Sequence, residues 1–570
     1  MRTILKYVKP YKRLMLFGIF AKTLAAFSEL AIPRMMAVII DEDVPSGELR
    51  RVFTSGGLML FFAFFTFAFN IIGNRAAARA SAMTAHDLRA DLFEKTLALD
   101  TAATDKYGLP SLISRLTADT YNITSFMARM LRMGIKAPLM LVGGIIITLT
   151  IDLRLALILV ATLPFVSLTV FVITKKSIGL YKQEQVILDS LVRRVDETHT
   201  GVRVIKSLSK TDYESRRFGR TSEELAKKEV EAGRLVSLTK PINDFLFYLG
   251  FCAVILLGWI LARYYDFDAV GKLLAFMTYF TVILNHMIMM TRIFVQASRS
   301  AASAARIEEV LLEESVLSVI DCESKAEDGY IVFDDVSFSY NKKAPNLDHI
   351  SFTLGRGETL GIIGVTGSGK TTLINILLRL YDPDEGTVRI AGEDIRSIPK
   401  ERLYSLFGIA FQNDFLFSGT AEENVAFFRR TDEDGLYKAA EAAQAREFID
   451  SDKDGFKRRI TTGATNISGG QKQRLTVARA LLGDPEILIL DDSSSALDFK
   501  TEAKLRAALK KRQGATTVIV TQRVSVIKHA DKIIVMDKGR AVGIGTHDEL
   551  LKTCDDYKEI VDVQMGGGSI

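Results

Sequence analysis

Six long apolar runs, all before residue 300, constrain most strongly how this chain of 570 residues can fold. Each run is long enough for a helix to cross a hydrocarbon layer of about 30 Å, which takes about 20 residues. The first run follows a basic segment and lacks a small-residue cleavage site, so it is expected to remain as a helix. The runs lie at about residues 14–40, 52–72, 135–151, 155–173, 245–262 and 273–291. The first half of the chain therefore predicts a membrane domain of six helices.

Basic residues indicate which way this domain faces, because Lys and Arg near span ends are retained on the cytoplasmic side. They are concentrated in the amino-terminal segment, whereas the turns at residues 41–48 and 264–268 are short and acidic. The segments 83–132 and 175–240 are rich in charge and helical in pattern, so they are expected to extend into the cytoplasm. The prediction is a multi-pass protein with both termini in the cytoplasm.

Charged residues inside the spans are candidates for function, because they are costly to bury in lipid. Lys22 and Glu29 share one face of the first helix but lie two turns apart, too far for a direct pair. They are either buried against a neighbouring helix or part of a polar substrate path, and the sequence leaves both open. The same question applies to polar residues of the sixth run, namely Asn285, His286, Arg292 and Gln296.

Composition narrows the classes of protein. Hydrophobic residues make up 48% and charged residues 25%, so the two must be segregated into a membrane part and a soluble part. Cys252, Cys322 and Cys554 are far apart and form no CxxC pair, which argues against a disulfide framework and structural zinc. The net charge of +5 is mild, and the basic clusters flank apolar runs. Nucleic acid is therefore not an expected partner.

The second half carries a phosphate-binding motif. From about residue 330, short β-rich runs alternate with helical stretches, which indicates an α/β domain. One run leads into Gly364-Val-Thr-Gly-Ser-Gly-Lys-Thr371, the pattern G-x-x-x-x-G-K-[ST] between a strand and a helix. Its glycines let backbone N–H groups face phosphates, Lys370 neutralises their oxygens, and the Thr371 hydroxyl can ligate Mg²⁺. The predicted nucleotide-binding residues here are Gly364, Thr366, Gly367, Ser368, Gly369, Lys370, Thr371 and Thr372.

Two further features accompany this loop. The apolar run 487–490 ends in Asp491-Asp492, which places Asp491 at the end of a parallel strand as a second predicted Mg²⁺ ligand. The segment 466–474 reads as a helix start that Ser468 can cap, another point where an anion can bind.

The sequence Ile467-Ser-Gly-Gly-Gln471 resembles the signature motif of ATP-binding cassette (ABC) proteins. Six spans followed by one cassette resemble half of a type IV ABC exporter over nearly the whole chain. The resemblance implies a multi-domain fold, with an all-α six-helix transmembrane domain followed by an α/β P-loop nucleotide-binding domain. The implied boundaries are 1–305 for the transmembrane domain with its cytoplasmic extensions, 306–329 for a linker, 330–565 for the nucleotide-binding domain and 566–570 for a flexible tail.

The same resemblance implies roles for single residues. Tyr340 matches the aromatic residue that stacks on adenine, and Gln412 matches the glutamine near Mg²⁺ and the attacking water. Ser495-Ala-Leu-Asp498 matches the D-loop. The residues implied to serve ATP held by an opposite cassette are Ser468, Gly469, Gly470, Gln471 and Asp498. Because two cassettes sandwich two nucleotides, one copy cannot complete a site.

Segments 105–111 and 211–218 look like the coupling helices of the family, at the tips of the cytoplasmic extensions. Such helices would carry closure of the cassettes to the membrane helices. Without such a contact, ATP binding could not bias the two transport states.

Two positions depart from the family pattern. Asp492 stands where the family has the glutamate that polarises the attacking water, so its carboxylate sits one methylene short. Misplacing a catalytic group by about 1 Å can cost roughly a hundredfold in rate. Gln522 stands where the family has a histidine, and an amide cannot become cationic. The signature is intact, so we predict a heterodimer in which this chain holds a slow ATP site and completes a competent one. The rival is a homodimer with two slow sites.

The leading functional prediction is an exporter subunit of a bacterial cytoplasmic membrane, of the multidrug type. It would use ATP and Mg²⁺, pair with a second ABC half-transporter and move lipophilic small molecules out across the bilayer. The alternatives are a homodimeric lipid or peptide exporter and a nucleotide-sensing regulatory membrane subunit. The six spans exclude a soluble ATPase of the DNA-repair type, and the fusion of spans and cassette disfavours import.

Overall fold

The computed structural model describes residues 2–264, 270–314, 317–321, 329–412, 415–493, 495–512 and 514–565. These residues form two compact units. The first contains Met1–Ala98 and Tyr107–Glu313, and the second contains Leu99–Lys106 and Glu314–Ile570. A short piece of the first half of the sequence thus belongs to the second unit.

Among its described residues, the first unit contains six helices that are long and apolar enough to cross a membrane, which confirms the six predicted spans. The first span comprises α1 (Arg2–Val8), η1 (Lys9–Tyr11), α2 (Lys12–Val38) and the π-helical η2 (Ile39–Asp43). The acidic residues at the start of the predicted 41–48 turn therefore continue the helix. Asp41 explains this, because its carboxylate accepts the backbone N–H groups of Gly271 (2.6 Å) and Lys272 (2.8 Å) at the start of the last span.

The other helices of this unit extend well beyond the apolar runs. In chain order they are α3 (Leu49–Ala98), α4 (Thr101–Tyr107), α5 (Leu109–Ser114), η3 (Arg115–Asp119), α6 (Thr120–Arg129), η4 (Met130–Gly134), α7 (Lys136–Ile151), α8 (Leu153–Thr200), α9 (Val202–Ser207), α10 (Thr211–Ser237), α11 (Thr239–Tyr264) and α12 (Val270–Leu312). The last helix runs past residue 305, where the sequence analysis ends the transmembrane domain. The predicted acidic turn at 264–268 lies almost wholly outside the described residues.

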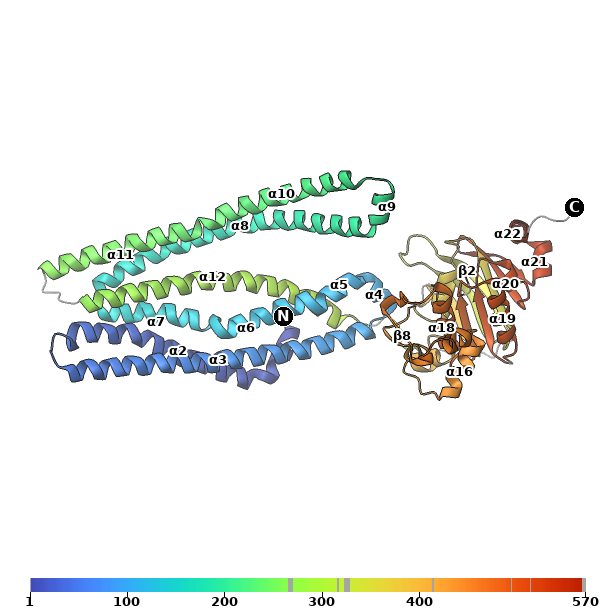
Figure 1. The fold of residues 1–570 in the computed structure, drawn as a ribbon, viewed down its shortest axis with the longest axis horizontal. Helices are drawn as coiled ribbons and strands as arrows, with labels where there is room; N and C mark the ends of the chain where they lie inside the picture. Colours follow the sequence, from blue (N-terminus) through green and yellow to red (C-terminus); the bar gives the residue numbers. More distant parts are fainter. Residues whose placement is uncertain are drawn as a thin grey trace. The chain divides into compact units, whose positions relative to one another are not determined.

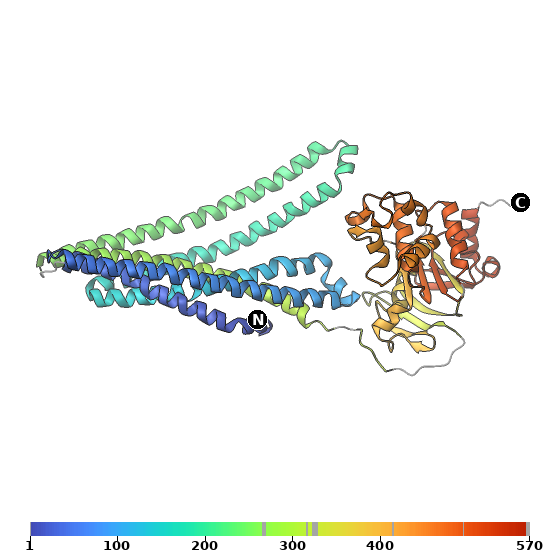
Figure 2. The ribbon, with the colours of Figure 1, turned by 60° about the horizontal axis from the view of Figure 1, so that its bottom comes forward.

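Helices α8 and α10 form a hairpin that diverges from the other helices of the first unit (Figures 1 and 2). The short helix α9 forms its tip, between Gly201 and Ser209, which has a positive φ of 52°. The segment 211–218, predicted to form a short helix at the tip, instead begins the long helix α10, and its coupling role stays a prediction. Charged residues recur through the whole of α10, so its first turns carry no distinguishing pattern.

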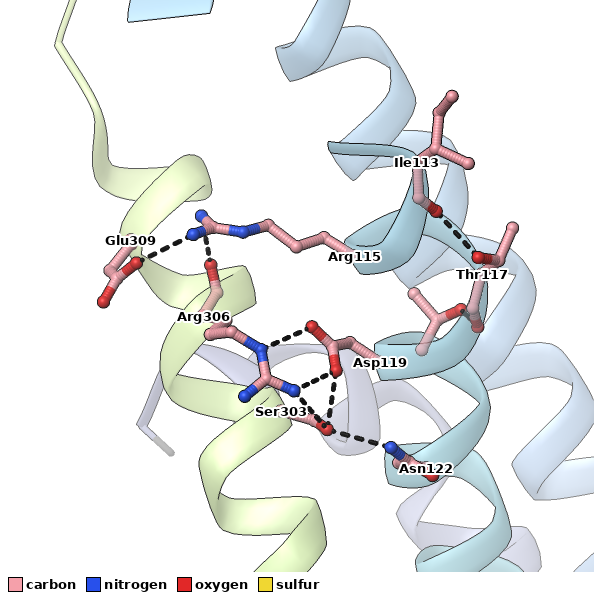
Figure 3. A network of polar contacts seen from close by, with 9 residues as sticks. Ile113, Arg115, Thr117, Asp119, Asn122, Ser303, Arg306 and Glu309 are labelled. Carbon is pink, nitrogen blue, oxygen red and sulfur yellow. Dashed lines mark hydrogen bonds and ion pairs between the residues drawn. The ribbon is translucent and has the colours of Figure 1, made fainter. Parts of the chain in front are cut away.

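A network of polar contacts joins η3 and α6, in the first half of the third span, to α12 (Figure 3). Asp119 is buried and accepts from both the guanidinium of Arg306 and the hydroxyl of Ser303 (2.8 Å). Arg115 donates to the backbone carbonyl of Arg306 (2.8 Å) and to Glu309 (3.1 Å). Charge-assisted bonds of this kind are stronger than neutral ones, so the two helices are expected to move together.

The charged residues inside the spans have partners on neighbouring helices. Lys22 is 3% exposed, and its amine donates to the amide oxygen of Asn70 on α3 (2.7 Å). Glu29 pairs with Lys136 at the start of α7 (2.5 Å). These contacts support burial against neighbouring helices for both residues. A ring nitrogen of His286 lies 2.8 Å from a backbone carbonyl of its own helix. The side chain of Arg292 lies outside the described residues.

The described residues of the second unit form three sheets, the smallest of which pairs β7 with β8. A six-stranded sheet has the order β12-β11-β3-β10-β9-β6, and a four-stranded sheet has the order β2-β1-β4-β5. The strands are β1 (Ile331–Phe338), β2 (Leu347–Leu354), β3 (Thr359–Gly364), β4 (Glu385–Ile390), β5 (Glu393–Asp394), β6 (Phe407–Ala410), β7 (Gly419–Thr420), β8 (Arg459–Ile460), β9 (Ile487–Asp491), β10 (Thr516–Val520), β11 (Lys532–Asp537) and β12 (Arg540–Gly545). The run before Gly364 and the run 487–490, both predicted as strands, form β3 and β9.

Parallel pairing fixes where the site forms. Strands β11, β3, β10, β9 and β6 pair in parallel, and β12 pairs antiparallel at one edge. The carboxyl ends of β3, β9 and β10 are therefore neighbours, where ligands bind in open α/β sheets. The buried strands read as continuous apolar runs because helices cover them. The α-helices described in this unit after α4 are α13 (Lys370–Leu377), α14 (Lys400–Ser405), α15 (Ala421–Ala426), α16 (Glu433–Ala442), α17 (Arg446–Asp450), α18 (Gly469–Leu481), α19 (Phe499–Lys510), α20 (Val524–Ile527), α21 (His547–Thr553) and α22 (Asp555–Met565).

Candidate functional site

The phosphate-binding loop lies between β3 and α13, as its motif predicts. Gly367 and Gly369 have φ values of 85° and 104°, a region that residues with a Cβ rarely adopt. A Cβ on Gly369 would also lie 2.8 Å from the backbone oxygen of Asn346. Glycine at these two positions is what lets the loop curl and point its N–H groups toward an anion.

Lys370 closes over the same loop. Its amine donates to the carbonyls of Gly364 and Val365, each at 2.8 Å, and lies 3.4 Å from the Ser368 hydroxyl. Burial lowers the pKa of Lys370, against the opposing effect of Asp491 and Asp492. The amine thus lies at the centre of a cradle of backbone groups, where phosphate oxygens would replace the carbonyls as its acceptors.

Two carboxylates end the neighbouring strand. Asp491 is the last residue of β9 and is 3% exposed, and burial, followed by the charge of Asp492, raises its pKa to about 6. Asp492 has a φ of 46°, and its N–H donates to the carbonyl of Val520 on β10 (2.9 Å). Burial also raises the pKa of Asp492, although Arg523, Gln412 and Lys370 act in the other direction.

Two amide side chains face this corner. The side chain of Gln412 donates to the carboxylate of Asp492 (3.4 Å), and that of Gln522 donates to the hydroxyl of Thr366 in the phosphate-binding loop (3.4 Å). Three of the residues singled out in the sequence, Gln412, Asp492 and Gln522, are thus gathered from β6, β9 and β10 around one loop. Both contacts are long, as expected of a site that tightens only with its ligand present.

Tyr340 stands next to α13. Its hydroxyl accepts from Asn375 (3.0 Å) and lies 3.5 Å from the hydroxyl of Thr372. Its ring is 45% exposed and meets the ring of Tyr381 edge-on, with centroids 5.0 Å apart. A partly exposed ring held in place beside the phosphate-binding helix is suited to stack on a flat ligand.

The signature segment forms the start of α18. Ser468 is the N-cap, and it and Gln471 satisfy each other's backbone N–H groups in a capping box. Gln473, one turn in, bonds to the hydroxyl of Ser495 (3.0 Å) and to the backbone N–H of Ala496 (2.9 Å). The signature helix and the D-loop are therefore held together within the second unit.

The D-loop leads into α19. Asp498 caps this helix by accepting from the N–H and the hydroxyl of Thr501, and these bonds lower its pKa. Arg523 reaches across from the loop after β10 and donates to the carbonyl of Ser495 (3.1 Å) and to the buried Glu502 (3.3 Å). The D-loop is thus tied both to the signature helix and to the segment that carries Gln522.

The oxygen donors at this corner suit Mg²⁺. Thr371 and Asp491 offer hard ligands, and Mg²⁺ takes one or two protein oxygens together with phosphates and water. Within the described ranges no group of three His, Cys, Asp or Glu side chains could hold a metal by itself. The residues therefore fit a Mg²⁺ that arrives with the nucleotide.

Comparison with known proteins gives the family. The ABC transporter transmembrane region matches residues 15–287, and the ABC transporter domain that follows it in the chain matches residues 347–495. The chain belongs to the ABC transporter family. It is accordingly a multi-pass membrane protein with an ATP-hydrolysing domain fused behind its spans.

Full-length relatives agree with this assignment. The chain is 33% identical to the uncharacterized ABC transporter ATP-binding protein YfiB of Bacillus subtilis, over 99% of each chain. It is 32% identical to the uncharacterized ABC transporter ATP-binding protein Rv1273c of Mycobacterium tuberculosis, over 98% of this chain and 97% of the relative. A bacterial Atm1-family ABC exporter solved with ATP bound shares the fold, with a TM-score of 0.80 at 22% identity over 97% of this chain and 99% of that one. The architecture of an ABC exporter half-transporter is thereby confirmed.

Several residues of this site were not found from the sequence. Tyr381 joins the cassette to the segment 99–106, because its hydroxyl donates to Asp105, and it also packs on Tyr340. Arg523 and Glu502 connect the D-loop to the segment after β10. None of them stands in a motif that by itself predicts a contact across more than 20 residues, so only the folded structure reveals them.

Proposed function

We propose that this ABC transporter chain is one subunit of a heterodimeric exporter, in which its own ATP site turns over slowly. ATP binding and hydrolysis by the pair would drive lipophilic substrates outward across a bacterial cytoplasmic membrane. The single observation that carries the proposal is Asp492 at the end of β9, where the family pattern calls for glutamate.

The position of Asp492 supports a weak base. Its N–H is bonded to the carbonyl of Val520 on β10, which holds the backbone in place, and its side chain is one methylene shorter than that of glutamate. Burial raises the pKa of Asp492, and the amide of Gln412, which donates to its carboxylate, opposes that effect by stabilising the ionised form and so lowering its affinity for a proton. Gln522 supplies a neutral donor where a histidine could become a cation. Two weakened groups in one site predict slow hydrolysis.

The remaining residues keep the means to bind nucleotide. In this proposal the loop from Gly364 to Thr372 and Lys370 hold the phosphates of ATP, and Tyr340 stacks on adenine. Thr371, Asp491 and Gln412 would hold Mg²⁺, which when bound neutralises phosphate charge. This chain's site therefore acts mainly as a place where ATP keeps the two cassettes together.

The intact signature serves the partner. In the proposed dimer Ser468 to Gln471, with Asp498, face ATP held by a second ABC half-transporter. The capping box supports this role because it orders the start of α18, and the N–H groups at a helix start attract an anion. A partner with glutamate and histidine at the two altered positions would complete a competent site.

Transport can be tested in inverted membrane vesicles that contain both subunits. ATP-dependent accumulation of a lipophilic dye inside the vesicles, abolished by Lys370→Ala in this chain or its counterpart in the partner, is the expected result. Nucleotide binding without any flux would instead favour a regulatory subunit. If this chain alone hydrolysed ATP as fast as the pair, the proposal that its own ATP site is slow would be contradicted.

A further inference from the structure

We propose that Gln564, in the last helix α22, positions the loop that carries Gln522. This loop, here called the switch loop, comprises residues 521–523 between β10 and α20, together with Val524, the first residue of α20. The inference deepens the proposed nucleotide site, on which its functional meaning rests. It concerns a positioning residue, since Gln564 touches the loop and not the phosphate-binding residues.

Helix α22 is firmly placed against the loop. Tyr557 is fully buried and Val561 is 9% exposed, and both belong to one apolar cluster with Val524 and Ile527 of α20. Positions 557, 561 and 564 follow the spacing of one helix face. Burial of the first two therefore sets the third beside the switch loop.

The amide of Gln564 spans the loop. Its oxygen accepts the N–H of Val524 (2.9 Å), and its nitrogen donates to the carbonyl of Gln522 (2.5 Å). The first N–H groups of a helix have no partner within it, so Val524, which begins α20, needs an outside acceptor. Because one partner is a donor and the other an acceptor, only one orientation of the amide satisfies both.

Other contacts hold parts of the loop, among them the N–H of Arg523, which donates to the hydroxyl of Thr521 (3.1 Å), whereas the amide of Gln564 reaches both Gln522 and Val524. The N–H of Thr521 donates to the carbonyl of Ile362 on β3 (3.1 Å), which holds the loop where it leaves the sheet. Arg523 bonds by its side chain to the D-loop. The amide of Gln564 braces the backbone on both sides of Arg523, so it fixes the direction in which Gln522 reaches Thr366. The end of the chain thus determines how the switch loop faces the phosphates.

The role of Gln564 is tested by amide hydrogen exchange of the full-length complex in lipid nanodiscs, measured with and without ATP and Mg²⁺. In Gln564→Ala, amides at 522–527 are expected to exchange about tenfold faster, because the loop loses two bonds. Amides at 364–372 should keep their rate and their protection by ATP, whereas ATP-dependent protection of the switch loop should be lost. Asp562→Ala, an exposed change on the same helix, should leave both regions as they were.

A second variant separates the two bonds. Gln564→Glu keeps an acceptor for Val524 but cannot donate to the carbonyl of Gln522, so the Val524 amide should stay slow while ATP-dependent protection of the loop is weakened. Unchanged exchange at Val524 in Gln564→Ala would overturn the proposal, as would equal acceleration at 364–372, which would indicate general loosening. If ATP did not slow exchange at 364–372 in the unaltered chain, nucleotide binding at this site would be refuted. The role of Gln564 would still be decided by comparing the exchange rates of the variant and the unaltered chain without nucleotide.

Discussion

At the scale of single residues, the site combines an intact phosphate cradle with two altered catalytic positions. The cradle depends on backbone geometry, which Gly367 and Gly369 secure. The altered positions depend on side-chain length and charge. In the proposed account, Asp492 and Gln522 would therefore leave nucleotide binding in place and slow ATP turnover.

Restoring side-chain length should restore turnover. Asp492→Glu, combined with Gln522→His, is expected to raise ATP hydrolysis at this chain's site by at least about tenfold, because the carboxylate moves toward the water by about 1 Å. Single-turnover hydrolysis of ATP by the purified complex measures it. Asp548→Glu, an exposed aspartate far along the chain, is the matched control. Equal rates in the double variant and the unaltered protein would show that the two positions do not limit hydrolysis.

The raised pKa of Asp491 predicts a pH dependence. Burial first, and then the neighbouring Asp492, hold this pKa at about 6, so Asp491 is ionised at pH 7 and takes up a proton as the pH falls through 6. Since Mg²⁺ binds only the ionised form, the affinity for Mg²⁺ in the presence of ATP should fall about tenfold per pH unit below 6. Titrations of Mg²⁺ between pH 5 and 8, at about one-unit steps, check this. In Asp491→Asn the affinity for Mg²⁺ should not show this decline below pH 6. A decline that persists in this variant would mean that another group titrates.

At the scale of elements, the segment 99–106 joins the cassette's unit although it lies between two membrane helices in the sequence. Tyr381 donates to Asp105 on α4 and packs edge-on against Tyr340, which is bonded to α13. Burial, together with the contact to Asp105, raises the pKa of Tyr381, so it remains a donor at neutral pH. A continuous set of contacts thus links the proposed adenine-stacking ring to α4.

Breaking that link should uncouple hydrolysis from transport. Tyr381→Phe removes the hydrogen bond to Asp105 but keeps the ring packed on Tyr340, so the affinity for nucleotide should change less than twofold. The amount of substrate transported per ATP hydrolysed should fall about fivefold, which corresponds to the loss of about 1 kcal/mol of coupling. Parallel assays of ATP hydrolysis and vesicle uptake measure the ratio. Tyr330→Phe removes a similar bond, from Tyr330 to Glu486 within the cassette (2.9 Å), and should leave the ratio unchanged. An unchanged ratio of substrate transported to ATP hydrolysed in Tyr381→Phe would show that the contact between Tyr381 and Asp105 does not couple hydrolysis to transport.

Local patterns explain which elements the sequence could predict. The strand before Gly364, the helix after Lys370 and the cap at Ser468 all follow from neighbouring residues, and each is present. The tip helix α9 was missed because the charged pattern of α10 continues without a break through the predicted segment. The partners of Lys22 and the contacts of Gln564 arise from packing between distant segments, so no spacing in the sequence reveals them.

At the scale of the whole molecule, the proposed account gives one chain halves of two different ATP sites. Its phosphate-binding loop and its signature would serve different nucleotides in a dimer, so altered residues in one site do not impair the other. The diverging hairpin of α8 and α10 exposes apolar side chains such as Val186, Val192 and Val204, which a second subunit could cover. These features favour a dimer over a monomer, and the proposal that its chains are unlike rests on Asp492 and Gln522.

The composition of the native complex tests this account most directly. The chain would be tagged at its native expression level, extracted from its source membrane and analysed by intact mass. We predict one copy of this chain with one different ABC half-transporter that carries glutamate and histidine at the positions of Asp492 and Gln522. A complex made only of copies of this chain, hydrolysing ATP at the rate of ordinary exporters, would contradict both the heterodimer and the slow site.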